Sequence, residues 1–406
     1  MKKKLLLIIG VFLFVFILLM IIALFIFTRG ITTSPKVSIL EECKTLFYNG
    51  NDKTNIVFFS NEEEARKYID SLLSFNILNK KQNEFNFFYI DDYKPDCELY
   101  NGVALFCHSR DLVKKTSSCP NDYIVVIEKQ PSNIRSSAYL NVISINSENP
   151  STVLAHEFGH VFANLAEEYV PANKLPRGQR NCVEGCKDFL GLENGCFQGC
   201  SKDNLLRSIE NGIMRTLKSE EFGNFNEYLI DLRIIESIEK KSKSITGRAV
   251  KTIEDCSEEE YYLIDADYNN GTIEVLSKSI EQGCPGTNGF GDLSYNFISE
   301  NTLIDSGNFN AELIFTDGGT EEEIDGELFD NNESFTIKLP TIEKLFVADE
   351  FVADEIPIVK KSAKLEIMRV GKVIKEIDLT DIGARACLVQ GEEADLENGT
   401  ERGAIE

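Results

Sequence analysis

Two histidines four residues apart are the most informative chemical feature of the sequence. His156 and His160 enclose Glu157 in the stretch His-Glu-Phe-Gly-His. On a helix, residues at i and i+4 project from the same side, so both imidazoles can bind one metal ion. Glu157 is then positioned to accept a proton from a water molecule activated by that metal. The pattern predicts one Zn²⁺ per chain, with His156 and His160 as ligands and Glu157 as the catalytic general base.

An apolar stripe supports a helix around these residues. Leu154, Phe158, Val161 and Leu165 recur at intervals of three and four residues, which on a helix places them roughly opposite the two histidines. Chance spacing of two surface histidines is the alternative, and it is disfavoured because the chain contains only three histidines. The third, His108, belongs to no such pattern and is expected to be structural or solvated.

A catalytic zinc ion needs a third protein ligand, and the adjacent carboxylates Glu167 and Glu168 compete for that role. On an uninterrupted helix Glu167 would lie about 10 Å beyond His160. The helix must therefore end and the chain turn back. Asn164 is suited to this turn, because asparagine tolerates a left-handed conformation better than most residues. Spacing alone leaves both carboxylates open, and the position of the turn favours Glu167.

Residues 156–169 also resemble a longer motif. They read His-Glu-Phe-Gly-His-Val-Phe-Ala-Asn-Leu-Ala-Glu-Glu-Tyr, which is similar to the motif H-E-x-G-H-x-x-x-x-L-x-D-E-Y of the IgA-peptidase family of zinc metallopeptidases. Residues 211–215, Asn-Gly-Ile-Met-Arg, and the Phe222-Gly223 and Asn226 that follow look like that family's later block. The resemblance covers about residues 138–230.

The resemblance implies a metzincin-like zincin domain. In such a domain Met214 would be the Met-turn residue beneath the metal, and Ala138–Ile145 would be the edge strand bordering the cleft. An extended peptide would add to that strand through main-chain hydrogen bonds. The chain departs from the family at two positions, with Glu167 in place of aspartate and Ala163 where related zincins have glycine. Both departures bear on the third ligand and leave the role of Glu157 untouched.

Four of the eleven cysteines form a regular pattern. Cys182, Cys186, Cys196 and Cys200 read C-x3-C-x9-C-x3-C. Two such pairs on antiparallel helices would face each other, which predicts a helical hairpin over residues 182–200 with disulfides Cys182–Cys200 and Cys186–Cys196. A four-cysteine zinc site is the alternative, but such sites commonly use C-x2-C spacing. The odd total leaves at least one cysteine outside any intramolecular pair.

The N-terminus predicts a membrane anchor. Three lysines precede an uncharged apolar run from Leu5 to Phe27, and a single membrane-spanning helix needs about 20 such residues. We expect residues 1–30 to form a transmembrane helix with the N-terminus in the cytoplasm. The chain would then be a single-pass membrane protein with its catalytic domain outside the cytoplasm.

The chain is acidic, with 66 acidic and 42 basic residues and a net charge of −24. Binding to phosphate backbones needs a surplus of Lys and Arg, so nucleic acid is excluded as a partner. An acidic surface usually serves only solubility, and it identifies no other partner.

The pattern of elements predicts two domains. Alternating strands and helices over residues 36–246 indicate an α/β zincin-like catalytic domain. Residues 250–390 carry strand-like runs separated by Gly, Asn and Asp, which favours an all-β, immunoglobulin-like sandwich. Residues 391–406 are expected to be a disordered acidic tail. The strand-like runs of the second domain are Thr272–Leu276, Ala311–Thr316, Phe335–Leu339 and Lys364–Leu379.

These features together predict a membrane-anchored zinc endopeptidase that hydrolyses protein or peptide substrates through a zinc-activated water, with Glu157 as general base. The alternative is a surface-displayed binding or adhesion protein with a degenerate peptidase fold and a structural zinc ion. The retained Glu157 argues against that alternative, because a structural site has no need of this carboxylate. A metal-free receptor or scaffold would leave the paired histidines unexplained.

Overall fold

The structure is a computed structural model. It describes residues 41–172, 174–243, 256, 259–269, 271–319, 324–331, 334–341, 362–380 and 382. The expected membrane helix (1–30) and the expected acidic tail (391–406) lie outside these residues. Within the described part of the chain, no helix is both long and apolar enough to cross a membrane. The described residues thus contain no helix that supports the predicted single-pass topology.

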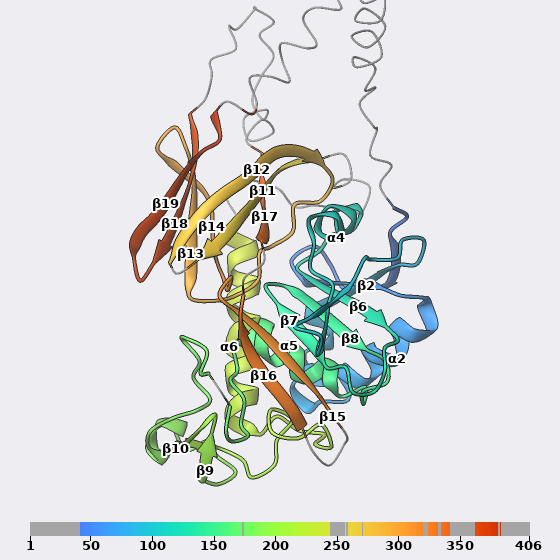
Figure 1. Cartoon of the computed structure of the whole chain (residues 1–406), viewed down its shortest axis with the longest axis vertical. Coiled ribbons are helices and arrows are strands. Elements are labelled where there is room, and N and C mark those ends of the chain that lie inside the picture. Colours follow the sequence, from blue (N-terminus) through green and yellow to red (C-terminus); the bar gives the residue numbers. More distant parts are fainter. Residues whose placement is uncertain are drawn as a thin grey trace, which may run out of the picture. The chain divides into compact units, whose positions relative to one another are not determined.

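An eight-stranded mixed sheet forms the scaffold of the N-terminal half (Figure 1), with the strand order β1-β3-β2-β6-β8-β7-β15-β16. Four of its inner strands, β3, β2, β6 and β8, run parallel to one another. They are rich in Phe, Val and Ile, as expected of strands covered on both faces. The strands are β1 (Lys44–Phe47), β2 (Thr54–Phe59), β3 (Phe85–Ile90), β6 (Tyr123–Glu128), β7 (Ser136–Tyr139), β8 (Val142–Asn146), β15 (Leu313–Gly319) and β16 (Ile324–Asp330).

Helix α5 (Val153–Ala163) follows β8 and packs against this sheet and against α2 (Glu62–Leu73) and α6 (Asn224–Lys243). Ten of its eleven residues are buried, which makes it the central helix of the fold. Two shorter helices, α3 (Asn76–Lys80) and α4 (Arg110–Lys115), lie in the connections between strands. Helix α5 and the sheet share one continuous apolar core.

The C-terminal half forms two further antiparallel sheets, with orders β12-β11-β17 and β14-β13-β18-β19. Their inward-facing residues belong to one apolar cluster that includes Ile264 and Phe297. Strands β18 and β19 join in a tight hairpin at Val370 and Gly371, both with positive φ. The strands are β11 (Glu260–Asn269), β12 (Thr272–Gln282), β13 (Leu293–Ser299), β14 (Thr302–Phe309), β17 (Ser334–Pro340), β18 (Ala363–Arg369) and β19 (Lys372–Asp378).

Two small hairpins and three 3₁₀ turns complete the described elements. They are β4 (Glu98–Tyr100), β5 (Ala104–Phe106), β9 (Phe197–Cys200), β10 (Lys202–Arg207), η1 (Gln82–Glu84), η2 (Thr116–Ser118) and η3 (Cys186–Phe189).

The predicted fold class is wrong. Among the described residues strand exceeds helix, and these residues do not form a helix-rich α/β zincin domain followed by a separate sandwich. The clearest departure is the β15–β16 hairpin, which leaves the C-terminal strands and joins the N-terminal sheet beside β7. The run Ala311–Thr316 was correctly predicted as a strand, but its partner lies far away in the sequence. Pairing of this kind leaves no local pattern, because it depends on which edge of the folded sheet is available.

The predicted edge strand Ala138–Ile145 is also wrong. It divides into β7 and β8, which turn at Leu140, where φ is +53°, and pair antiparallel. Strand β7 is not an edge, because β15 covers its other side.

The predicted helical hairpin at residues 182–200 is replaced by a 3₁₀ turn and the β9–β10 hairpin. Gly185, Gly191, Gly195 and Gly199 lie in or beside this segment, and each glycine disfavours a helix by about 1 kcal/mol relative to alanine. The structure nevertheless joins Cys182 to Cys200 and Cys186 to Cys196, the pairing expected from the spacing. Three further disulfides join Cys43 to Cys119, Cys97 to Cys107 and Cys256 to Cys284.

Candidate metal centre

Helix α5 presents the two histidines from one side and an apolar stripe from the other. Leu154, Phe158 and Val161 are all at most 4 % exposed. Phe158 stacks on Phe162, with ring centroids 4.7 Å apart, and both rings contact the aromatic side chains of β3 and β6. The stripe therefore fixes the rotation of the helix about its axis, and with it the direction in which His156 and His160 point.

Asn164 ends the helix in the left-handed conformation, with φ of +51° and ψ of +40°. The backbone N–H of Leu165 donates to the carbonyl of Gly159 at 3.1 Å, and that of Asn164 to His160 at 3.0 Å. These bonds close the last turn as in a left-handed helix cap. The turn predicted at Asn164 is therefore confirmed. It sends the chain back along the helix, so that Glu167 returns to the level of the histidines.

Four side chains converge on one point. The Nε2 atoms of His156 and His160 lie 3.1 Å apart. Glu167 places Oε2 3.4 Å from the His156 nitrogen and Oε1 3.0 Å from the His160 nitrogen. Asp317 Oδ2, on strand β15, lies 3.4 Å and 3.6 Å from the same two nitrogens. The four side chains are at most 2 % exposed.

The hydrogen bonds of the two Nδ1 atoms show that Nε2 of each histidine faces the space between the four side chains. His156 Nδ1 lies 2.9 Å from the carbonyl oxygen of Ile213, and His160 Nδ1 lies 2.7 Å from that of Leu165. A carbonyl only accepts, so each Nδ1 carries the proton and each Nε2 presents a lone pair. Both carboxylate oxygens of Glu167 and Oδ2 of Asp317 likewise have no hydrogen-bond donor in the described residues.

This arrangement fits a tetrahedral zinc ion. Lone pairs that face one another in a buried space repel, and a cation removes that repulsion. Zinc bonds to histidine and carboxylate are about 2.0–2.2 Å long, which in a tetrahedron sets neighbouring ligand atoms about 3.3–3.5 Å apart. The observed separations scatter around that value. Each histidine also has the carbonyl acceptor that typically orients a metal-binding imidazole.

Glu168 points away from this cluster. Its Oε1 accepts hydrogen bonds from Asn226 Nδ2 at 2.9 Å and Asn181 Nδ2 at 3.3 Å. Burial raises the pKa of Glu168 to about 7, although the two amide donors act in the opposite direction. Of the two candidates for third ligand, the structure brings only Glu167 to the histidines. Glu168 instead braces the turn, and its backbone N–H donates to the carbonyl of Met214.

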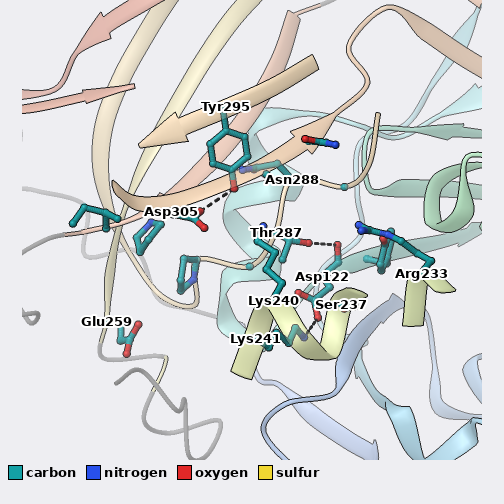
Figure 2. Close-up of a pocket in the computed structure, with 18 residues that line it drawn as sticks. Asp122, Arg233, Ser237, Lys240, Lys241, Glu259, Thr287, Asn288, Tyr295 and Asp305 are labelled. Atoms are coloured by element: carbon teal, nitrogen blue, oxygen red, sulfur yellow. Dashed lines mark hydrogen bonds and ion pairs between the residues drawn. The ribbon is translucent and has the colours of Figure 1, made fainter. Parts of the chain in front are cut away.

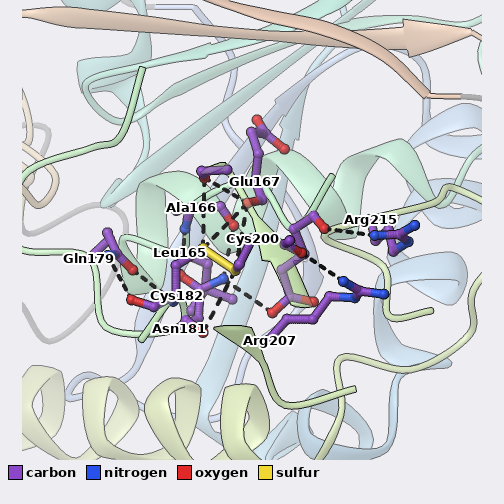
Figure 3. Close-up of a disulfide and its surroundings, with 12 residues drawn as sticks. Leu165, Ala166, Glu167, Gln179, Asn181, Cys182, Cys200, Arg207 and Arg215 are labelled. Carbon is purple, nitrogen blue, oxygen red and sulfur yellow. Dashed lines mark hydrogen bonds between the residues drawn. A yellow bond between two sulfur atoms is a disulfide. The ribbon is translucent and has the colours of Figure 1, made fainter. Parts of the chain in front are cut away.

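The Cys182–Cys200 disulfide lies beside the backbone of Glu167 (Figure 3). The Glu167 carbonyl accepts a 2.7 Å hydrogen bond from the hydroxyl of Ser201, and the Cys182 sulfur lies 3.5 Å from the same oxygen. Asn181 holds the preceding residue, accepting from the N–H of Ala166 at 2.7 Å and donating to its carbonyl at 2.8 Å. The disulfide segment therefore fixes the backbone that carries the third carboxylate.

Met214 packs against α5 at Gly159. It is fully buried, and a side chain at Gly159 would meet the Met214 sulfur, which lies 2.8 Å from the position of a Cβ there. Glycine between the two histidines thus lets Met214 pack directly against α5. The role of Met-turn residue, which the resemblance implies for Met214, stays a prediction.

Glu157 occupies the same buried region as the ligands. Its two carboxylate oxygens are buried and have no hydrogen-bond partner among the described residues. Burial, with the nearby charge of Asp317 adding to it, raises the pKa of Glu157 well above its ordinary value. A buried carboxylate without a protein partner is costly, so its presence beside the histidines needs a reason other than stability.

Asp317 was not found by sequence reasoning. It lies in the segment Phe315-Thr316-Asp317-Gly318, far from the histidines in the chain and without a motif. Only the pairing of β15 with β7 brings its carboxylate to the metal centre.

His108 takes no part in the cluster. It is buried, and its ring packs edge-on against Tyr139 at 5.0 Å. Burial lowers the pKa of His108 to about 4, so the side chain is neutral near pH 7.

No protein family and no curated protein matches the chain in comparisons with known proteins. The IgA-peptidase assignment therefore stays a prediction, carried by the residues of the motif alone.

A separate cavity of about 200 Å³ lies beside the C-terminal part of α6 (Figure 2). Its polar groups largely bind one another. Lys241 pairs with Asp122, Tyr295 donates to Asp305 at 2.8 Å, and Lys240 lies over the Tyr295 ring. None of the metal-centre residues lines it.

Proposed function

We propose that this chain is a zinc peptidase that hydrolyses peptide bonds in protein or peptide substrates. One observation carries the proposal: the buried, unpartnered carboxylate of Glu157 lies beside three side chains suited to zinc. His156, His160 and Glu167 would hold the ion. A purely structural site gains nothing from an additional buried carboxylate, whereas hydrolysis requires a base at this position.

Bound zinc supplies Lewis acidity, which polarises a carbonyl and makes water acidic near neutral pH. The chain's own residues supply the rest. Glu157 accepts the proton of the attacking water and returns it to the leaving amine. The Ile213 and Leu165 carbonyls keep Nε2 of both histidines directed at the metal. The surrounding apolar core excludes bulk water, which strengthens each of these electrostatic interactions.

The test is a peptide-library digest with metal analysis. The purified chain should hold about one zinc per molecule. Glu157→Gln should keep the zinc but lose peptide cleavage by about 10²–10⁴-fold, the usual effect of removing a general base. Glu63→Gln, a change at an exposed carboxylate on α2, is the matched control and should leave both unchanged. Equal cleavage by the Glu157→Gln protein and its parent would contradict the proposal.

A binding or adhesion protein with a structural zinc ion is the second candidate, and one observation favours it. Asp317 supplies a fourth protein ligand atom, and structural zinc sites are typically closed by four protein ligands. Such a protein would bind zinc and cleave no peptide, even after Asp317 is replaced. Peptide cleavage by an Asp317 variant therefore distinguishes the zinc peptidase from the binding protein.

A further inference from the structure

Strand β15 lies where an extended substrate would lie. A peptide bound to a strand beside a catalytic helix pairs with it through main-chain hydrogen bonds. In this chain the strand next to α5 is β7, and β15 already pairs with it, Phe315 opposite Ala138 and Asp317 opposite Ser136. Figure 1 shows β15 and β16, in orange, beside α5.

The side chains of β15 also close the metal centre. Asp317 Oδ2 lies 3.4 Å and 3.6 Å from the two histidine nitrogens, where it would be a fourth ligand of a zinc ion held by the other three side chains. The Phe315 ring stacks on the His160 ring, with centroids 4.2 Å apart. Since His156, Glu157 and Asp317 are all 0 % exposed, a peptide reaches them only if β15 moves.

A hydrogen bond and the space left by a glycine keep Asp317 in this position. The Tyr169 hydroxyl donates to Asp317 Oδ1 at 3.0 Å. Gly326, the partner of Asp317 across the hairpin, leaves room for this pair, because a Cβ at position 326 would overlap Asp317 Oδ1 and the Tyr169 hydroxyl.

Strand β15 forms more residue pairs with its hairpin partner β16 than with β7 in the rest of the sheet. Strands β15 and β16 share seven registered pairs, from Leu313–Asp330 to Gly319–Ile324. Strands β15 and β7 share only three. Because β16 ends the sheet on the other side, the hairpin can leave β7 while keeping its own ladder intact.

We propose that the β15–β16 hairpin is an internal inhibitor of the metal centre. Strand β15 occupies the position of a peptide substrate, and Asp317 is the fourth metal ligand that excludes water. Release of the hairpin from β7 withdraws Asp317 and opens both the coordination position and the strand edge. This regulation rests on the proposed peptidase function.

The experiment replaces Asp317 and asks whether a small chelating probe reaches the metal. The full chain is loaded with Co²⁺, whose visible spectrum reports its ligands, and titrated with acetohydroxamate. The parent protein should bind acetohydroxamate only weakly, because only the molecules with a released hairpin can bind it. Asp317→Ala should keep one metal ion per chain and show a saturable change. Thr316→Ser, a change on the opposite face of the same strand that keeps the hydroxyl bound to the Glu327 carbonyl, should behave as the parent.

Peptide cleavage by the zinc-loaded proteins is the second measurement. If the hairpin is released in about 0.1–10 % of parent molecules, Asp317→Ala should cleave about 10- to 1000-fold faster. Gly326→Ala keeps every metal ligand but crowds Asp317 away from Tyr169. It should also admit acetohydroxamate, and it keeps the experiment decisive if Asp317→Ala does not fold.

Three results would overturn the inhibitor. These are loss of the metal in Asp317→Ala but not in Thr316→Ser, equal acetohydroxamate binding by the parent and both hairpin variants, or measurable cleavage at an equal rate by all three proteins. The last result leaves the peptidase intact. In the converse case, the hairpin variants bind acetohydroxamate more tightly than the parent while no protein cleaves peptide. That result supports the hairpin as a cover of the metal centre and rejects the peptidase function.

Discussion

At the level of single residues, the adjacent glutamates Glu167 and Glu168 differ in role because their surroundings differ. Glu167 and Glu168 have the same side chain and are both fully buried. Glu167 faces two histidine nitrogens and has no hydrogen-bond donor among the described residues, whereas Glu168 accepts from Asn181 and Asn226. A carboxylate with amide donors is satisfied without a metal, and one without donors requires a cation.

This difference predicts unequal effects on zinc affinity. Glu167→Ala should abolish tight zinc binding, because it removes a ligand. Glu168→Ala should weaken binding only about 10–100-fold, the usual effect of losing a group that supports the ligands. Zinc affinity is measured by competition with a chromogenic chelator, and His108→Ala, outside the cluster, controls for a general loss of packing. If neither glutamate variant releases zinc, the assignment of the third ligand is wrong.

At the level of elements, short segments position the ligands. The left-handed turn at Asn164 returns the chain to the histidines, and the disulfide segment holds the Glu167 carbonyl. The two disulfides of that segment differ in their distance from the site. Cys182 and Cys200 are buried against Glu167, whereas Cys186 and Cys196 join the outer part of the same loop.

The two disulfides should therefore affect zinc binding differently. Replacing both Cys182 and Cys200 by serine should weaken zinc affinity about 10–100-fold, as expected when the support of a ligand is disturbed. It should also lower stability by about 3 kcal/mol, because a loop of this length is no longer closed. Replacing Cys186 and Cys196 is the matched control, and it should cost stability with little change in zinc affinity. Equal losses of zinc affinity in the two proteins would show that the segment does not position Glu167.

At the level of the whole molecule, the metal centre joins distant parts of the chain. Three of its side chains follow one another in and after α5, and the fourth comes from the C-terminal half through β15. A metal bound by all four would stabilise the docked hairpin together with α5, since binding to the folded state alone shifts unfolding by mass action.

Metal removal should therefore loosen the hairpin before the rest of the sheet. Chelation should increase hydrogen exchange of the β15 amides that pair with β7, and should leave the inner strands β2 and β6 protected. In Asp317→Ala the same amides should exchange rapidly with or without metal, because the link between metal and hairpin is absent. Slow exchange in β15 after chelation, equal to that of the metal-loaded parent, would refute the coupling.

The sequence by itself determined the features that depend on local spacing. Helical periodicity identified α5 and the direction of His156, Glu157 and His160, because residues at i and i+4 share a face whatever surrounds the helix. The need to turn the chain pointed to Asn164 and favoured Glu167. Strand-like runs such as Phe335–Leu339 and the pairing of Cys182 with Cys200 followed from equally local patterns.

Only the tertiary structure decided what depends on long-range pairing. Strand β15 was predictable as a strand, but its register beside β7 is set by the folded edge that it meets. Asp317 reaches the metal centre through that register alone, so no spacing in the sequence revealed it. The fold class was mistaken for the same reason, since it assumed that strands near one another in the chain belong to one module. Local propensity selects an element, whereas burial and strand pairing across the molecule select its partners.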